Sequence, residues 1–305
     1  MAEPADRWLE RDGVSLHCLE WSPEATSALP PVLLLHGLSS NAQYWGRIAR
    51  LLKQRRVIAL DQRGHGLTGR PPHSPAHPAG YAMEALLEDI DHAIKILELG
   101  RPVLVGHSWG ATIALEFAAR NPVAASALVF VDGPVQSAAN LFSWEEGQAF
   151  MQPPLPRYSS FAQAVADCRD DFEGTWGDDL EPFVFARLMP EGEALILTLT
   201  ASIRLELLRG LYESPVDMLW SQLEIPALAL LARGGPSRVT AWRESGVKQL
   251  AKNAPHVTVK WFDTPHDIPL YAPEAVAAEV ETMAATAIDS PASESEAAAR
   301  QQLQD

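Results

Sequence analysis

The stretch VLVGHSWGATIAL, residues 103–115, is the strongest indication of the fold in this chain. An apolar run of strand character leads into Gly106, and an Ala-rich helical pattern begins at Trp109. Ser108 stands between them in a Gly-x-Ser-x-Gly pattern, which is weak alone but specific between a buried strand and a helix. So tight a turn projects the serine hydroxyl over the edge of the sheet. We therefore predict that Ser108 is a catalytic nucleophile rather than a helix N-cap.

Strand and helix patterns alternate on both sides of this stretch. Strand patterns occur at residues 31–35, 57–60, 102–105, 127–131, 226–231 and 257–262, and the first of them is a short apolar run without period-two alternation. Helical patterns occur at residues 44–53, 82–99, 109–120, 240–252 and 273–287. This order predicts an α/β fold with a doubly wound, mostly parallel sheet.

The alternation breaks over residues 134–222, which hold aromatic residues and helical patterns without a strand signal. We expect this segment to be an inserted helical cap over the carboxyl edge of the sheet, where ligands bind in such folds. Residues 1–133 and 223–288 would then form the core. The tail at residues 289–305, rich in Ser, Ala, Glu and Gln, is expected to be disordered.

Composition narrows the classes of partner. The chain has 305 residues and a formal net charge of -15, which argues against nucleic acid and anionic membranes. No apolar run is long enough for a membrane helix, and the first residues lack a signal-peptide pattern. Cys18 and Cys168 indicate free thiols in a reducing compartment. We expect a cytoplasmic protein that acts on a small molecule without cofactor or metal; the sequence does not indicate its oligomeric state.

A serine nucleophile needs two donors for the oxyanion that its attack creates. One is the backbone N–H of Trp109, at the start of the helix that follows Ser108. The second should come from the loop after the first central strand, where His36, Gly37 and Leu38 follow the apolar run. We predict the N–H of Leu38 as this donor, and a buried, structural role for His36.

The base that activates Ser108 is predicted to be His266. It follows the last strand pattern and precedes the last helix, which places it at the same edge of the sheet as Ser108. His256 begins that strand and lies at the wrong end, and His107 is too close to Ser108 in sequence to reach its hydroxyl. The alternative for His266 is a solvated loop residue.

The sequence indicates less clearly which carboxylate should hydrogen-bond to His266. The turn after residues 226–231 commonly carries it, but there Ser237 stands about where a carboxylate is expected. Asp132 ends the strand before the cap, at the carboxyl edge, and we predict it as the acid. Glu244 and Asp267 remain alternatives, and Asp132 could instead cap the turn into the cap segment.

Together these blocks resemble the α/β-hydrolase superfamily, from about residue 31 to residue 287 with the cap left out. The resemblance rests on His36-Gly37, residues 61–66 (DQRGHG), residues 106–110 and the late His266, in that order. It implies a Ser-His-acid triad, no cofactor and a cap that sets specificity. It also implies a structural role for residues 61–66, and members that lack the usual acid often carry it where Asp132 stands.

The resemblance leaves several reactions open. Haloalkane dehalogenases and epoxide hydrolases use an aspartate nucleophile, so Ser108 argues against both. The leading hypothesis is hydrolysis of a carboxylic ester, lactone or thioester of a moderately apolar molecule through an acyl-enzyme. Amide cleavage is an alternative, and so is carbon–carbon bond hydrolysis, which Asn41 after the His-Gly loop supports in part. A ligand-binding protein without turnover is the third hypothesis.

Overall fold

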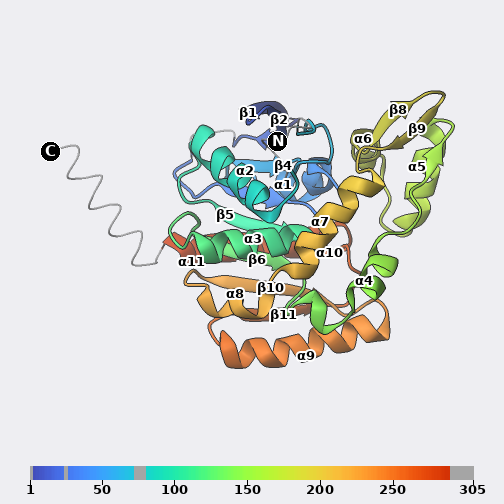
Figure 1. Cartoon of the computed structure of the whole chain (residues 1–305). Helices are drawn as coiled ribbons and strands as arrows, with labels where there is room; N and C mark the ends of the chain where they lie inside the picture. The colour runs from blue at the N-terminus through green and yellow to red at the C-terminus, as the bar shows by residue number, and fades with distance from the viewer. Residues whose placement is uncertain (1–2, 24–26, 72–79, 289–305) are drawn as a thin grey trace.

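The computed structural model describes residues 3–23, 27–71 and 80–288. Its main sheet has eight strands in the order β1-β2-β4-β3-β5-β6-β10-β11 (Figure 1). Their bounds are β1 Ala5–Arg11, β2 Val14–Trp21, β3 Val32–Leu35, β4 Val57–Leu60, β5 Val103–His107, β6 Ala127–Val131, β10 Ala227–Ala232 and β11 Thr258–Phe262. The six strands from β4 to β11 in this order pair in parallel. The predicted doubly wound, mostly parallel sheet is confirmed; the tail that we expected to be disordered lies outside the described residues.

Helices cover both faces of the sheet, which explains why its central strands β4, β3, β5, β6 and β10 are fully buried and mostly apolar. In β3, Leu33 and Leu35 face one core cluster, whereas Val32 and Leu34 face the other. The first cluster is closed by α2 (Met83–Ile96), α3 (Trp109–Arg120), α8 (Val216–Gln222) and α9 (Ser237–Asn253). The second is closed by η1 (Ala42–Trp45), α1 (Gly46–Leu51), α10 (Ile268–Tyr271) and α11 (Pro273–Ile288).

Strands β1 and β2 were not expected from the sequence. They pair antiparallel with each other, and β2 pairs antiparallel with β4. Strand β1 lies at the edge of the sheet and is mostly exposed, and four of its seven residues are charged, so it gives no apolar run. Strand β2 is buried but carries His17 and Glu20, whose partners come from elsewhere in the fold.

The segment inserted between β6 and β10 is mainly helical, as expected. It contains η2 Ala138–Asn140, α4 Trp144–Met151, α5 Phe161–Asp171, η3 Asp178–Leu180, α6 Glu181–Ala186 and α7 Ala201–Glu213, followed by α8. Our expectation that it has no strands was wrong, because β7 (Arg157–Tyr158), β9 (Ala194–Leu197) and β8 (Leu188–Glu191) form a small antiparallel sheet. These strands are two to four residues long, and Pro190 interrupts one of them, so they leave no readable pattern.

The inserted segment does not lie wholly apart from the core. In Figure 1, α5 and the small sheet stand beside the core, and α7 runs back across it. Helix α8 then packs on the core, where the rings of Phe130 and Trp220 lie 5.0 Å apart. The division at residues 134 and 222 therefore stays a prediction.

Candidate active site

The turn between β5 and α3 holds Ser108 in a strained backbone conformation. Ser108 has φ 55° and ψ −119°, a region that residues with a Cβ rarely adopt. A Cβ on Gly106 would lie 2.4 Å from the carbonyl oxygen of Gly110. One on Gly110 would lie 2.4 Å from the carbonyl oxygens of Leu35 and His36. Both glycines are therefore required for β5, α3 and the loop after β3 to meet at Ser108.

Ser108 lies on the wall of a cavity of about 470 Å³ between the core and the cap segment. All five residues predicted for the site line it: Leu38, Ser108, Trp109, Asp132 and His266. Most of the remaining wall is apolar, with Leu141, Phe142, Phe150, Met151, Leu211, Val239 and Trp242. A hollow of about 580 Å³ between α2 and α7 holds none of the five, so the smaller cavity is the candidate active site.

Asp132 and His266 are in direct contact. The Nδ1 atom of His266 lies 2.6 Å from Oδ2 of Asp132. The carboxylate is fully buried, whereas the imidazole is 45% exposed. Asp132 follows β6 with φ 42°, and its Oδ1 also accepts a hydrogen bond of 2.8 Å from the N–H of Ala232, just across the sheet. The carboxylate is thus fixed by the edges of two neighbouring strands.

This contact sets the protonation equilibrium of His266. Desolvation opposes the charged imidazolium, but the hydrogen bond to Asp132 and the negative charge of that carboxylate outweigh it. The net result is a pKa of His266 above its ordinary value of 6.5. A raised pKa makes the imidazole a stronger base, which suits a general base.

Arg243 is a member of this cluster that sequence reasoning missed. It lies in α9 and is buried, and its guanidinium donates to Oδ2 of Asp132 and, at 3.2 Å, to the carbonyl oxygens of Ala232 and Gly234. Arg243 lies on the buried stripe of α9 with Gly246 and Leu250. An arginine on the buried stripe of a helix could have indicated this contact from the sequence, because a buried arginine needs an acidic partner.

The loop that carries His266 is held by residues from β5 and η1. The Nε2 atom of His107 donates to the carbonyl oxygen of His266 at 3.1 Å, so His107 supports the backbone that carries His266. Tyr44 stacks on His107 with ring centroids 5.0 Å apart, and its hydroxyl donates to Asp267 at 3.0 Å. Burial, and secondarily the charge of His266, lowers the pKa of His107 to about 3, so it stays neutral.

Backbone donors lie beside Ser108 as an oxyanion would require. A Cβ on Gly37 would lie 3.2 Å from Cβ of Ser108, so the loop into Leu38 runs directly past Ser108. Trp109 is the first residue of α3, and its N–H points out of the helix end. Among the described residues, neither the N–H of Leu38 nor that of Trp109 has a hydrogen-bond partner. Both are therefore able to bind a negative oxygen.

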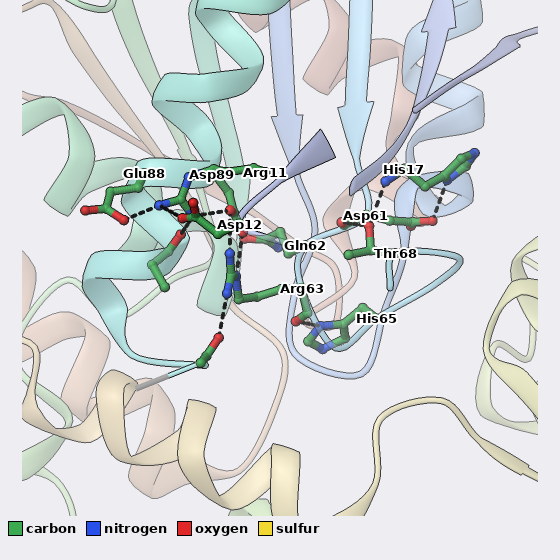
Figure 2. A network of polar contacts seen from close by, with 12 residues as sticks. Arg11, Asp12, His17, Asp61, Gln62, Arg63, His65, Thr68, Glu88 and Asp89 are labelled. Carbon is green, nitrogen blue, oxygen red and sulfur yellow. Dashed lines mark hydrogen bonds and ion pairs between the residues drawn. The ribbon is translucent and has the colours of Figure 1, made fainter. Parts of the chain in front are cut away.

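The buried side chains of the segment 61–66 belong to the polar network shown in Figure 2, and they are Asp61, Gln62, Arg63 and His65. The carboxylate of Asp61 accepts from the N–H groups of Ala42 and Leu67, at 2.6 and 2.9 Å, and contacts His17 at 2.7 Å. Arg63 pairs with Asp89 through two hydrogen bonds of 2.6 Å. These contacts hold the loop without a ligand, which fits the structural role that we expected for it.

His65, in the same network, connects it to the loop that follows β3. Its Nε2 accepts from the N–H of Ser39 at 3.3 Å, and its ring lies 5.2 Å from that of Trp109. His36 is fully buried, donates from Nδ1 to the carbonyl oxygen of Gly37 at 2.8 Å and accepts from the N–H of Gln62. Burial lowers the pKa of His36 to about 3, so both of its bonds are those of a neutral ring.

The other residues considered from the sequence lie elsewhere. Asn41 is fully buried, caps η1 and donates to the carbonyl oxygen of Phe183 at 2.9 Å, so its side chain is committed to structure. His256 precedes β11, at the opposite end of that strand from His266. Glu244 is exposed on α9 and does not line the cavity. Cys18 and Cys168 are buried free thiols, and burial raises their pKa to about 12 and about 11.

The described ranges contain neither a cluster of three metal-ligating side chains nor a helix that could cross a membrane. No three His, Cys, Asp or Glu side chains in the described part of the chain gather closely enough to hold a metal ion. No helix within those ranges has both the length and the apolar character needed to cross a membrane.

Comparison with known proteins gives a consistent family signal. The family model described as "alpha/beta hydrolase fold" matches residues 30–178. Epoxide hydrolase 3 of Xenopus tropicalis is 36% identical over 137 residues, which cover 42% of this chain and 36% of that protein. The chain spans about a third of the length of the first curated relatives it matches.

Solved structures match over nearly the whole chain. The crystal structure of E-2-(acetamidomethylene)succinate hydrolase has a TM-score of 0.76 at 21% identity, covering 94% of this chain and 100% of that one. The thioesterase domain from the curacin biosynthetic pathway has a TM-score of 0.73 at 20% identity, covering 92% and 100%. At this identity the likeness establishes the fold alone.

Proposed function

Because this chain belongs to the α/β-hydrolase superfamily, we propose that it is a serine hydrolase with Ser108 as nucleophile, His266 as general base and Asp132 as the acid. One observation carries the proposal: the 2.6 Å contact of His266 with the buried Asp132 lies in the wall of the cavity that also exposes the strained Ser108. A buried carboxylate in contact with a half-exposed imidazole, in the wall of a cavity that a partly exposed serine also lines, is the arrangement expected to activate a hydroxyl.

The geometry suggests the order of proton transfers. Nδ1 of His266 faces Asp132, so Nε2 is the nitrogen left to take the proton of the Ser108 hydroxyl. The hydroxyl oxygen attacks the carbonyl carbon, and the N–H groups of Leu38 and Trp109 bind the resulting oxyanion. The imidazolium then protonates the leaving alcohol or thiol, and water activated by the same imidazole hydrolyses the acyl-enzyme.

The cavity favours a moderately apolar substrate. Its wall is largely aliphatic and aromatic, and about 470 Å³ is enough for a molecule of drug-like size. We propose a carboxylic ester, lactone or thioester. The thioesterase domain among the structural neighbours supports the thioester member of this class. Ser108 argues against the epoxide chemistry that the name of the Xenopus relative denotes, because that reaction uses an aspartate nucleophile.

Amide hydrolysis is the second candidate. The neighbour named E-2-(acetamidomethylene)succinate hydrolase has a TM-score of 0.76, against 0.73 for the thioesterase domain, and the substrate in its name contains an acetamido group. The same nucleophile and base would serve both reactions, since only the leaving group changes from oxygen or sulfur to nitrogen. Carbon–carbon hydrolysis loses its one sequence indication, because the side chain of Asn41 is engaged in structure.

The proposal is tested by labelling the purified protein with a small fluorophosphonate and locating the adduct by mass spectrometry. We expect one adduct, on Ser108, that is absent in Ser108→Ala and strongly reduced in His266→Ala. Circular dichroism of both variants would show that the fold is kept. A folded wild-type protein that reacts neither with fluorophosphonate nor with smaller acylating reagents would instead support the binding-protein hypothesis.

A further inference from the structure

Arg204 is a positive charge in the wall of the cavity that has no acidic partner among the described residues. It comes from α7 and lines the cavity together with Ser108 and Leu38. The other charged or titratable side chains of the wall, Asp132, Arg243 and His266, are bonded to one another. Within the described ranges Arg204 takes part in no ion pair, and its only hydrogen-bond acceptors are neutral.

Its two contacts fix the guanidinium without neutralising it. Nε donates to the carbonyl oxygen of Met151, the last residue of α4, at 2.7 Å, and Nη1 donates to the hydroxyl of Ser39. Ser39 is the neighbour of Leu38, so the guanidinium lies against the loop proposed to bind the oxyanion. The rest of the N–H groups of Arg204 have no partner in the described part of the chain.

Placing a guanidinium there is unfavourable unless something negative binds it. Desolvation lowers the pKa of Arg204, and the nearby charge of Arg187 lowers it further, while no acidic group of the described residues raises it. A partly buried cation among apolar side chains is uncommon without a counter-ion. The planar guanidinium also presents parallel donors that match the two oxygens of a carboxylate, which an ammonium group does not.

We propose that Arg204 binds a carboxylate group of the substrate, so that the substrate is an ester, thioester or amide that also carries a carboxylate. This inference rests on the proposed function, because it places the anion on the molecule that Ser108 attacks. The net charge of -15 does not prevent it, since repulsion from distant surface charges is largely screened beyond about 8 Å at physiological salt. The fixed guanidinium of Arg204 inside the cavity therefore has the larger electrostatic effect on a bound carboxylate.

A binding experiment tests the anion site without requiring turnover. In the Ser108→Ala protein, calorimetric titration compares 3-phenylpropanoate with 3-phenylpropanamide, which differ in charge but hardly in shape. We expect the carboxylate to bind about 10- to 100-fold more tightly than the amide, because a guanidinium forms charge-assisted, bidentate hydrogen bonds with a carboxylate. Adding Arg204→Met should abolish this preference, and adding Arg204→Lys should keep part of it.

The matched control is Arg209→Met, in the same helix. Arg209 is exposed, lies over the ring of Trp144 and lines the other hollow, so its removal should leave the preference unchanged. A carboxylate that binds no better than the amide, or a preference that survives in a folded Arg204→Met protein, would overturn the inference. Absence of measurable binding by either compound counts against it in the same way.

A kinetic comparison separates this inference from the proposed function. Wild-type kcat/KM is measured for the mono-4-nitrophenyl ester of glutaric acid and for 4-nitrophenyl pentanoate. Arg204→Met should lower the value about 10- to 100-fold for the first ester and change the second less than about threefold. If both esters are cleaved and Arg204→Met affects them equally, the serine hydrolase stands and the carboxylate site fails. If the carboxylate binds selectively but neither ester is cleaved, the anion site stands and the hydrolase proposal fails.

Discussion

Replacing Arg243 by Met should raise the pH at which the enzyme becomes active. Arg243 and His266 share one oxygen: the Nη2 and Nδ1 atoms lie 2.5 and 2.6 Å from Oδ2 of Asp132, so they are at most about 5 Å apart. The positive charge of Arg243 works against protonation of His266 and lowers its pKa. Met has a similar length and apolar stem but no charge, so the variant leaves Asp132 with His266 as its remaining cationic partner.

The magnitude follows from Coulomb's law. His266 is 45% exposed, so an effective dielectric constant of about 40, between the surface and bulk-water values, is reasonable. Two unit charges about 5 Å apart then repel by about 1.7 kcal/mol, which corresponds to about one pKa unit. The acid limb of the kcat/KM profile should therefore move upward by about one unit, because His266 must lose its proton before it can act as base.

The loss of folding stability in Arg243→Met should also depend on pH, because it depends on whether His266 is protonated. The folded-state pKa of His266 is raised, so its pair with Asp132 stabilises the fold fully below pH 6.5 and less as pH rises through the folded pKa. The imidazolium can therefore offset part of the loss of Arg243 in acidic solution, and less of it as the pH rises. We expect Arg243→Met to lower the free energy of unfolding by about 3 kcal/mol at pH 9 and by clearly less at pH 6.

Two measurements check this reasoning: kcat/KM for a neutral aryl ester from pH 5 to 9.5, and urea unfolding at pH 6 and pH 9. The control is Lys248→Met, which removes one positive charge from an exposed position of the same helix. An acid limb that stays in place or moves to lower pH would refute the electrostatic role of Arg243. Equal destabilisation at both pH values would show that Arg243 acts through packing alone.

Three other results follow from the same geometry. In the wild-type enzyme, kcat/KM should rise with pH around a midpoint above 6.5, and a flat profile would argue against His266 as base. Asp132→Asn keeps the shape but removes the charge that holds the imidazole, and should lower kcat by about 10³- to 10⁴-fold in single-substrate kinetics; a loss below tenfold would contradict the role of Asp132. Gly110→Ala should cost about 3 kcal/mol in urea unfolding, because the new Cβ would lie 2.4 Å from two carbonyl oxygens. Its control, Gly210→Ala in α7, meets no atom within 4 Å and should be neutral or stabilising by up to about 1 kcal/mol, so equal effects would contradict the argument from close approach.

Much of the fold could be predicted because its elements are encoded locally. The strands that are buried on both faces are continuous apolar runs, and each helix between them has its own spacing. The elements that escaped prediction lack such a signal. Strand β1 is an exposed edge, and the strands of the cap segment are too short for a period to develop.

The sequence by itself determined the turn at Ser108, because the strand, both glycines and the helix that force the strained conformation are contiguous. It also placed His266 and Asp132 at one edge of the sheet, since the carboxyl ends of parallel strands converge there. Only the tertiary structure decided which groups touch. Asp132 meets His266 across 134 residues and Arg243 across 111, and Arg204 reaches Ser39 across 165. Hydrogen bonds at such separations depend on side-chain direction and on how helices pack, and no local pattern encodes either of these.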